Sequence, residues 1–246
     1  GRGPVGAAGR GGEAPRLQLP WAANSATLGD LGEALGAAEH ANVDAIALGP
    51  QQTAATAVSL GVLRLSAQEL VLNRQPLGDA GCGVACGFCR PWVGRLVAAR
   101  FLECQLGDAG AVEIARLLLG DARHRASPAL SAAACNLREL VLSANRIGDA
   151  GIARIAEALP RCDALERLLV DRNCIGPAGA MSLGKCLPRS NLRELVLGSH
   201  LGGNPVGPVG ATALARALDD RMERAAADRP NRLQALNLED CMVGAA

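Results

Sequence analysis

A pattern of leucines that recurs along the chain constrains its fold more than any other feature. One copy spans residues 137–151 and has the sequence LRELVLSANRIGDAG, and the next copy begins 28 residues later at Leu165. Internal repeats of this length indicate a solenoid, in which one structural unit is stacked on the next. With the fainter copies included, we expect about eight units, whose candidate strands lie near Leu17, Val43, Leu70, Leu96, Leu137, Leu165, Leu192 and Leu233.

Each unit changes its hydrophobic period partway along. The leucines at its start alternate, as they do in a short strand, whereas Ile152, Ile155 and Leu159 have the spacing of one helix face. A single strand and a single helix, each with one apolar face, bury those faces only when units stack into a continuous core. The sequence therefore predicts an α/β solenoid curved like a horseshoe, with a parallel sheet on the concave face and helices on the convex face.

The repeated motif L-x-x-L-x-L-x-x-N-x-I-G-D-A-G resembles that of the ribonuclease-inhibitor-like subfamily of leucine-rich repeats, and the resemblance covers nearly the whole chain. This subfamily includes the repeat domains of Ran GTPase-activating proteins and of nucleotide-binding leucine-rich-repeat receptors. The motif is specific for the fold and uninformative about function. We expect a flexible Gly/Arg-rich tail over residues 1–13 and a single repeat domain over residues 14–246. The last copy stops at Val243 and Gly244 without the polar cap that ends a solenoid, so we expect the domain to be truncated at its C-terminus.

Three insertions interrupt the regular spacing of the units. Two polar segments, near residues 119–134 and 219–230, follow helices, and we interpret them as surface loops, with a partner contact as the alternative. A shorter insertion over residues 198–203 follows a strand. It is predicted to lie at the rim where strand turns to helix, which is a better position for a partner contact.

Composition and charge argue against several classes of partner. The formal net charge is +1, so the chain lacks the basic excess that binds nucleic acid. No apolar run reaches the roughly 18 residues that a membrane span needs. The nine cysteines are too sparse for a disulfide framework and odd in number, which favours reduced core residues and an intracellular protein. We therefore expect a protein partner, no nucleic-acid or membrane binding, and a cytoplasmic location, with the nucleus as the alternative.

Three cysteines have the spacing that is most suggestive of chemistry. Cys82, Cys86 and Cys89 match the C-x3-C-x2-C spacing with which radical-SAM enzymes hold an iron–sulfur cluster. Alignment of the repeats offers another interpretation, because these cysteines fall on the inward helix positions of the unit. A free cysteine at such a position acts as a small apolar residue, and this is the role that we predict.

Other chemical motifs are incomplete. The segment GAMSLGKC over residues 179–186 nearly matches a phosphate-binding loop, but Cys186 stands where that motif needs Ser or Thr, and the repeat places Gly184 in the middle of a helix. The aspartates of the Gly-Asp-Ala-Gly turns are interpreted as helix caps rather than catalytic acids. We therefore expect a protein that is not an enzyme and that binds no cofactor or metal.

One polar position follows the strand in each unit. Asn145 and Asn173 occupy it, Cys104 and Cys241 occupy it in other units, and Gln75 takes it in a further copy. A side-chain amide there can bond to the backbone of the neighbouring unit, so we expect a structural role along the stack.

The candidate binding surface is the concave face of the sheet, where the residues beside the strand leucines point away from the helices. Its apolar central row is flanked by charges of both signs, which suits a protein partner better than a polyanion. The alternative is that these exposed strand positions simply hold β-prone residues. The residues predicted to contact a partner are Val71, Arg100, Glu139, Val141, Arg167, Leu169, Asp171, Arg172, Glu194, Val196, Asn237 and Glu239.

The leading functional hypothesis is a non-catalytic scaffold that binds a protein partner through the concave face and the rim loops. One alternative, implied by the resemblance, is a GTPase-activating protein for a Ran-like small GTPase. Another is the ligand-sensing repeat region of a larger nucleotide-binding leucine-rich-repeat receptor.

Overall fold

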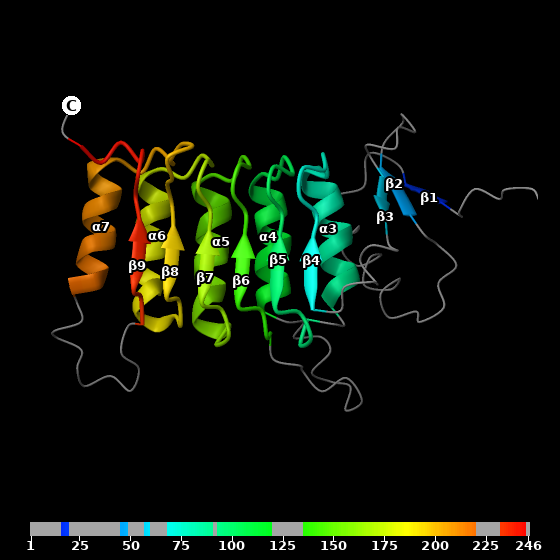
Figure 1. Ribbon diagram of the computed structural model, residues 1–246, viewed down its shortest axis with the longest axis horizontal. Coiled ribbons are helices and arrows are strands. Elements are labelled where there is room, and N and C mark those ends of the chain that lie inside the picture. Colours follow the sequence, from blue (N-terminus) through cyan, green and yellow to red (C-terminus); the bar gives the residue numbers. More distant parts are fainter. Residues whose placement is uncertain are drawn as a thin grey trace, which may run out of the picture.

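Six parallel strands lie side by side in one sheet of the computed structural model (Figure 1). The structure describes residues 68–90, 93–119, 135–219 and 232–244, together with three short strands nearer the N-terminus. Each neighbouring pair of the six strands is parallel, as the repeat predicts. In chain order, which is also their order in the sheet, they are β4 (Glu69–Val71), β5 (Ala98–Arg100), β6 (Glu139–Val141), β7 (Arg167–Leu169), β8 (Glu194–Val196) and β9 (Ala235–Asn237).

One helix follows each of the first five strands of this sheet, and the helices cover one of its faces (Figure 1). Two 3₁₀ turns, η5 (Leu159–Arg161) and η6 (Leu187–Arg189), extend the third and fourth of these helices. The five helices are α3 (Gly78–Cys89), α4 (Asp108–Leu119), α5 (Asp149–Ala158), α6 (Pro177–Cys186) and α7 (Gly207–Asp219).

The core lies between the sheet and the helices. Leu70, Leu140 and Leu168 belong to one register row, and all three are buried. From the helix side, Ile152 and Ile155 are fully buried, as their spacing predicts. Stacked layers of aliphatic side chains therefore form one continuous core through the six units.

Two of the eight expected strands lie in a separate sheet. β1 (Arg16–Leu19) pairs in parallel with β2 (Ala45–Leu48), but β2 also pairs antiparallel with β3 (Ala57–Ser59). The repeat does not predict β3, and an antiparallel neighbour ends a succession of parallel strands. The continuous parallel sheet therefore contains six strands rather than about eight, and the horseshoe curvature stays a prediction.

Some expectations concern residues outside the described part of the chain. The tail over residues 1–13 and most of the insertions near 119–134 and 219–230 lie there. The extent of the repeat domain, residues 14–246, stays a prediction. Within the described ranges, no helix is both long and apolar enough to cross a bilayer.

The aspartate of each Gly-Asp-Ala-Gly turn caps the helix of the next unit rather than its own. Asp108 Oδ1 accepts hydrogen bonds from the backbone N–H groups of Gly148 (2.7 Å) and Gly151 (2.9 Å), where α5 begins. Asp79 and Asp149 make the same pair of contacts with the units that follow them. The predicted capping role is confirmed. The capped helix belongs to the next unit, because stacking places each carboxylate beside the neighbouring helix end, whose N–H groups lack intrahelical partners.

Where asparagine occupies the polar position after a strand, its side chain joins neighbouring units, as predicted for Asn145 and Asn173. Asn145 Oδ1 accepts hydrogen bonds from the backbone N–H groups of Cys104 and Leu106, and its Nδ2 donates to carbonyl oxygens of both units. Asn204 makes equivalent bonds in the β8 unit. The repeat alignment does not reveal Asn204, because the insertion over residues 198–203 moves this position further from its strand.

Candidate functional site

The outward face of the sheet presents one register row that is largely apolar. From β4 to β9 this row consists of Val71, Arg100, Val141, Leu169, Val196 and Asn237. Successive residues of a strand point to opposite faces, so the row lies on the face away from the buried leucines and the helices. Val71 is exposed and the other five residues are half-buried. Val141, Leu169 and Val196, which lie on three consecutive strands, form its continuous apolar part.

A chain of ion pairs crosses the same face next to this row. Glu69, Glu139, Arg167 and Glu194 share the neighbouring register row, to which β5 contributes an alanine. Arg100 reaches across from the apolar row to Glu69 (3.1 Å) and Glu139 (2.7 Å). Arg167 then contacts Glu139 (2.6 Å) and Glu194 (2.7 Å). Five charges of alternating sign therefore connect β4 to β8. We call the surface that consists of these five charged residues and the largely apolar row the sheet-face surface.

The charged side chains of the sheet-face surface form ion pairs with one another. The hydrogen bond with Glu139 raises the pKa of the Arg100 guanidinium above its usual value, so this side chain stays charged. Exposed pairs contribute little to stability individually, typically about 0.2–1 kcal/mol, but side chains that share partners in a network are held in place. The alternation of sign leaves no continuous track of positive charge for a nucleic-acid backbone on this face.

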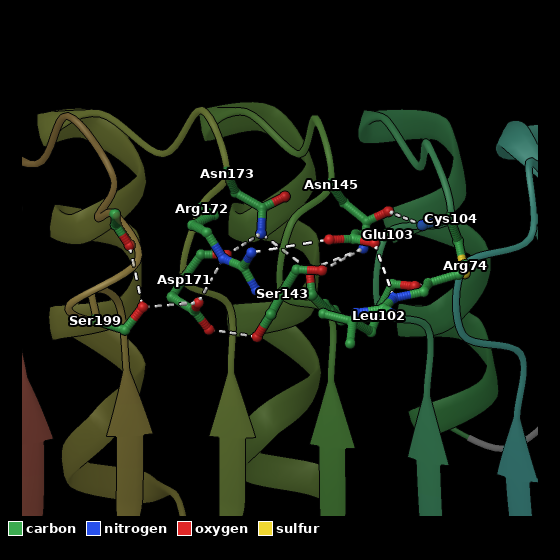
Figure 2. A network of polar contacts seen from close by, with 12 residues as sticks. Arg74, Leu102, Glu103, Cys104, Ser143, Asn145, Asp171, Arg172, Asn173 and Ser199 are labelled. Carbon is green, nitrogen blue, oxygen red and sulfur yellow. Dashed lines mark hydrogen bonds and ion pairs between the residues drawn. The ribbon is translucent and has the colours of Figure 1, made fainter.

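A second polar network, which we call the rim network, lies at the carboxyl ends of the strands, where each strand turns toward its helix (Figure 2). The buried Asp171 carboxylate accepts hydrogen bonds from the hydroxyls of Ser143 and Ser199 and contacts the Arg172 guanidinium at 3.1 Å. Arg172 also lies 3.9 Å from Glu103, which pairs with an arginine of the β4 unit. Both serines are 28 residues from Asp171, so the repeat spacing itself contained a signal for this cluster.

The insertion over residues 198–203 forms a tight loop at this rim. The backbones of Ser199 and Gly202 exchange two hydrogen bonds. A Cβ atom on Gly198 would overlap a carbonyl oxygen of the turn after β9, so only glycine allows this close approach. Leu201 is 63% exposed. The insertion therefore lies at the rim between strand and helix, as predicted, and it presents an apolar side chain there.

The predicted contact residues fall into three places. Asp171 and Arg172 belong to the rim network, in which the buried Asp171 holds its neighbours in position. Asn237, the last residue of the outward row, and Glu239 lie at the end of β9, where Asn237 Oδ1 accepts a hydrogen bond from the Glu239 N–H at 2.8 Å. The other predicted residues form most of the sheet-face surface: Val71, Arg100, Glu139, Val141, Arg167, Leu169, Glu194 and Val196. Their role in binding stays a prediction.

The cysteine triplet lies in the core. Cys82, Cys86 and Cys89 of α3 are buried, which confirms their interpretation as core residues. A hydrogen bond between the Cys82 and Cys86 thiols, whose Sγ atoms are 3.8 Å apart, raises the pKa of Cys82, and burial raises the pKa of Cys89. Within the ranges that the structure describes, no group of three or more His, Cys, Asp or Glu side chains is placed to hold a metal.

We expect thiol reagents to distinguish these cysteines from Cys174. Cys174 is exposed, whereas burial and a raised pKa keep Cys82 and Cys89 protonated, and the thiolate is the reactive form. In native protein at about pH 8, close to the pKa of a free thiol, peptide mass spectrometry should detect labelling at Cys174 before labelling at Cys82 and Cys89. A Cys174→Ser variant should lose this fast phase. Equally rapid labelling of Cys89 in the native protein would contradict its place in the core.

The near phosphate loop is part of a helix. Gly184, Lys185 and Cys186 form the end of α6, so Gly184 lies in a helix as predicted, but near the end of that helix rather than in its middle. Their backbone amides take part in the helix instead of cradling a phosphate. A Cβ atom on Gly184 would lie 3.1 Å from the carbonyl oxygen of Ala213 in α7. This glycine therefore allows two neighbouring helices to pack closely.

A family model described as "Leucine Rich repeat" matches residues 133–156, which include β6 and most of α5. This match supports a leucine-rich-repeat protein, in agreement with the strand and helix of each unit. Among solved structures, the chain is similar to leiomodin-1 actin-binding site 2, with 15% identity, a TM-score of 0.43, and 68% of this chain and 92% of that chain covered. It is also similar to the tropomodulin C-terminal domain of Caenorhabditis elegans, with 13% identity, a TM-score of 0.45, and 68% and 93% covered. A search of curated proteins found no match.

Proposed function

We propose that this chain is a protein-binding repeat domain, which binds a protein partner through the sheet-face surface and the rim loop over residues 198–203. The observation that carries the proposal is the apolar row of Val141, Leu169 and Val196 on the side of the sheet away from the helices. A partner that covers these side chains removes apolar surface from water, and this favours association.

The charges beside the apolar row support a protein as the partner. They alternate in sign and already pair with one another across five strands. A partner can therefore cover the row without desolvating an isolated ion, which is the costly step in burying charge. Protein interfaces combine an apolar centre with a polar rim. Leu201 adds an exposed apolar side chain at the edge of the same surface.

Replacing Val141 and Leu169 together with glutamate should abolish binding through this surface. The two changes place like charges side by side on neighbouring strands and next to Glu139, so the apolar centre of the interface is lost. The few residues at the centre of an interface that dominate binding cost about 2 kcal/mol or more each when truncated, and two charges there add desolvation, so we expect affinity to fall at least about a hundredfold. The measurement is capture of partners from cell extract on the immobilised chain, followed by titration of each captured protein.

The matched control carries two glutamates on the helix layer. Leu119 in α4 and Val209 in α7 are exposed apolar residues, and their joint replacement by glutamate should leave capture unchanged. Circular dichroism should show that both double variants remain folded. Retained capture by Val141→Glu/Leu169→Glu would reject the sheet face as the binding surface and direct attention to Leu201.

We also propose that the units belong to the ribonuclease-inhibitor-like subfamily. Leucine-rich repeats carry either an α-helix or a 3₁₀-helix after each strand, and α3 to α7 are α-helices of 10–13 residues. Activation of a Ran-like GTPase and service as the sensing region of a larger receptor stay predictions from that resemblance, as does a cytoplasmic location. Stimulated GTP hydrolysis by Ran on addition of the chain is the measurement that tests the first of these.

A further inference from the structure

A hollow of about 410 Å³ lies on the helix layer, between α6, η6 and α7. Three cationic side chains line it: Lys185 in the last turn of α6, Arg189 in η6 and Arg216 in the last turn of α7. All three residues are exposed. Among the residues that the structure describes, none of those lining the hollow is acidic. Positive charge from three separate elements therefore gathers at one place.

Small and apolar residues complete the hollow. Gly184 allows α6 and α7 to pack closely, and Ala213 and Ala217 line the hollow from α7. Met181 and Pro188 also line it, and Met181 is 42% exposed. An apolar wall beside three cations suits a ligand that combines an anionic group with an organic part.

At this place α6 differs from α4 and α5, because its cation has no acidic residue in its own helix. Lys185 and Arg216 each lie six residues after the second glycine of their turns, so they occupy equivalent positions on adjacent helices. The corresponding residues of α4 and α5, Arg116 and Glu157, each have an ion partner three residues away in their own helix, at 2.7 and 2.9 Å. The helix α6 contains no acidic residue. Neighbouring like charges repel, and an anion between them relieves the repulsion.

We propose that this hollow binds a phosphate group on a phosphorylated side chain of a partner protein. Such a group carries about −1.5 to −2 charges near pH 7 and three acceptor oxygens, which matches three cations better than a single carboxylate does. Two of the cations are arginines, whose planar guanidinium groups can each donate two hydrogen bonds to phosphate. The hollow has room for more than a phosphate, and its apolar wall can contact the flanking peptide, which favours a protein-borne phosphate.

A purely structural role for these cations has different consequences. Cations in the last turn of a helix stabilise it through the helix dipole, and this alone accounts for Lys185 and Arg216. In that case, charge reversal lowers thermal stability, and the hollow binds no ligand. The proposal predicts instead that charge reversal removes binding while the chain stays folded.

The test measures fluorescence anisotropy of labelled peptides on addition of the full chain. One pool of short peptides has a phosphoserine at its centre and random flanks, and the other has serine. We expect the phosphoserine pool to bind at least about tenfold more tightly, and its binding to weaken below about pH 6 as the phosphate takes up a second proton. Arg189→Glu/Arg216→Glu should weaken binding of this pool at least about a hundredfold.

The controls separate this proposal from its alternatives. Arg154→Glu changes an exposed arginine of α5 outside the hollow and should bind the phosphoserine pool as the wild type does. Failure of the phosphoserine pool to bind, equal binding of both pools, or unchanged binding by Arg189→Glu/Arg216→Glu would each overturn the proposal. If inorganic phosphate or free O-phosphoserine binds as tightly as the peptides, the ligand of the hollow is a free phosphate compound and not a phosphorylated protein. The Val141→Glu/Leu169→Glu variant should retain phosphopeptide binding, so the outcome is independent of the sheet-face proposal.

Discussion

Replacing Asn173 with leucine is expected to lower the free energy of unfolding by about 3 kcal/mol or more. The Asn173 side chain accepts a hydrogen bond from the Ile147 N–H (3.0 Å) and donates to the carbonyl oxygens of Leu142 (2.9 Å) and Val170 (3.0 Å). Leucine is similar in size but has no hydrogen-bonding group, so buried backbone groups of two units lose their partner. Because one side chain joins β6 to β7, its loss weakens the stack and not only its own turn.

Urea denaturation measures this effect as a lower midpoint at constant slope. The matched control is Asn191→Leu. Asn191 makes a single hydrogen bond in an exposed setting, to the carbonyl oxygen of Asp163 at 2.7 Å. Its replacement should cost about 1 kcal/mol or less. An unchanged urea midpoint for Asn173→Leu would show that the amide does not hold the units together.

Replacing Gly151 with alanine should destabilise the protein by about 2–4 kcal/mol. A Cβ atom at this position would lie 2.6 Å from Asp108 Oδ1 and 2.9 Å from both the Asp108 Cα and the Ala111 Cβ. The backbone of the preceding unit cannot move away without disturbing the stack, and the displaced carboxylate loses its hydrogen bonds to the start of α5. The recurring second glycine of the turn is therefore required by contact between units.

Thermal and urea unfolding of two further variants test this explanation. A Cβ atom on Gly244 would meet no other atom within 4 Å, so Gly244→Ala should change stability by about 0.5 kcal/mol or less. The double variant Asp108→Ala/Gly151→Ala should be less destabilised than the sum of its single variants, because the clash and the cap involve the same carboxylate. Strict additivity would show that Gly151 acts through its own helix alone.

Much of the local structure could be predicted because the hydrophobic pattern of each strand and helix is visible in the residues of a single unit. The alternation around Leu140 predicts a strand, and the spacing of Ile152 and Ile155 predicts the buried face of α5. Alignment of units also predicted the buried cysteines of α3 and the helical position of Gly184. These predictions succeed because side-chain direction within a strand or helix follows from the residue count alone.

The N-terminal region shows where this pattern ceases to be sufficient. The faint copies there do form parallel strands, β1 and β2, yet β3 then pairs antiparallel with β2. A short run of alternating residues does not specify which edge of a sheet it joins or in which direction. The number of strands in the continuous sheet therefore depends on which segments pair with each other, and the hydrophobic pattern of one segment does not reveal its partners.

Within the candidate site, the sequence predicted the outward residues but not their partners. The position of Arg100 in the outward row follows from the alternation of side chains along a strand. Its ion pairs with Glu69 and Glu139 form because β5 places a small alanine between these two glutamates. In the same way, Asp108 is recognisable as a cap, but its target is a helix that begins 41 residues after its own, at Asp149.

The repeating unit, its strand, its helix and the faces that each buries follow from the sequence alone, because they depend on periods of a few residues along one segment. Packing of one unit on the next determines which groups meet between units: the caps from one unit to the next, the alternating ion pairs, the serine partners of Asp171 and the three cations around the hollow. These contacts act across the stack, where register and close packing bring together residues of different units.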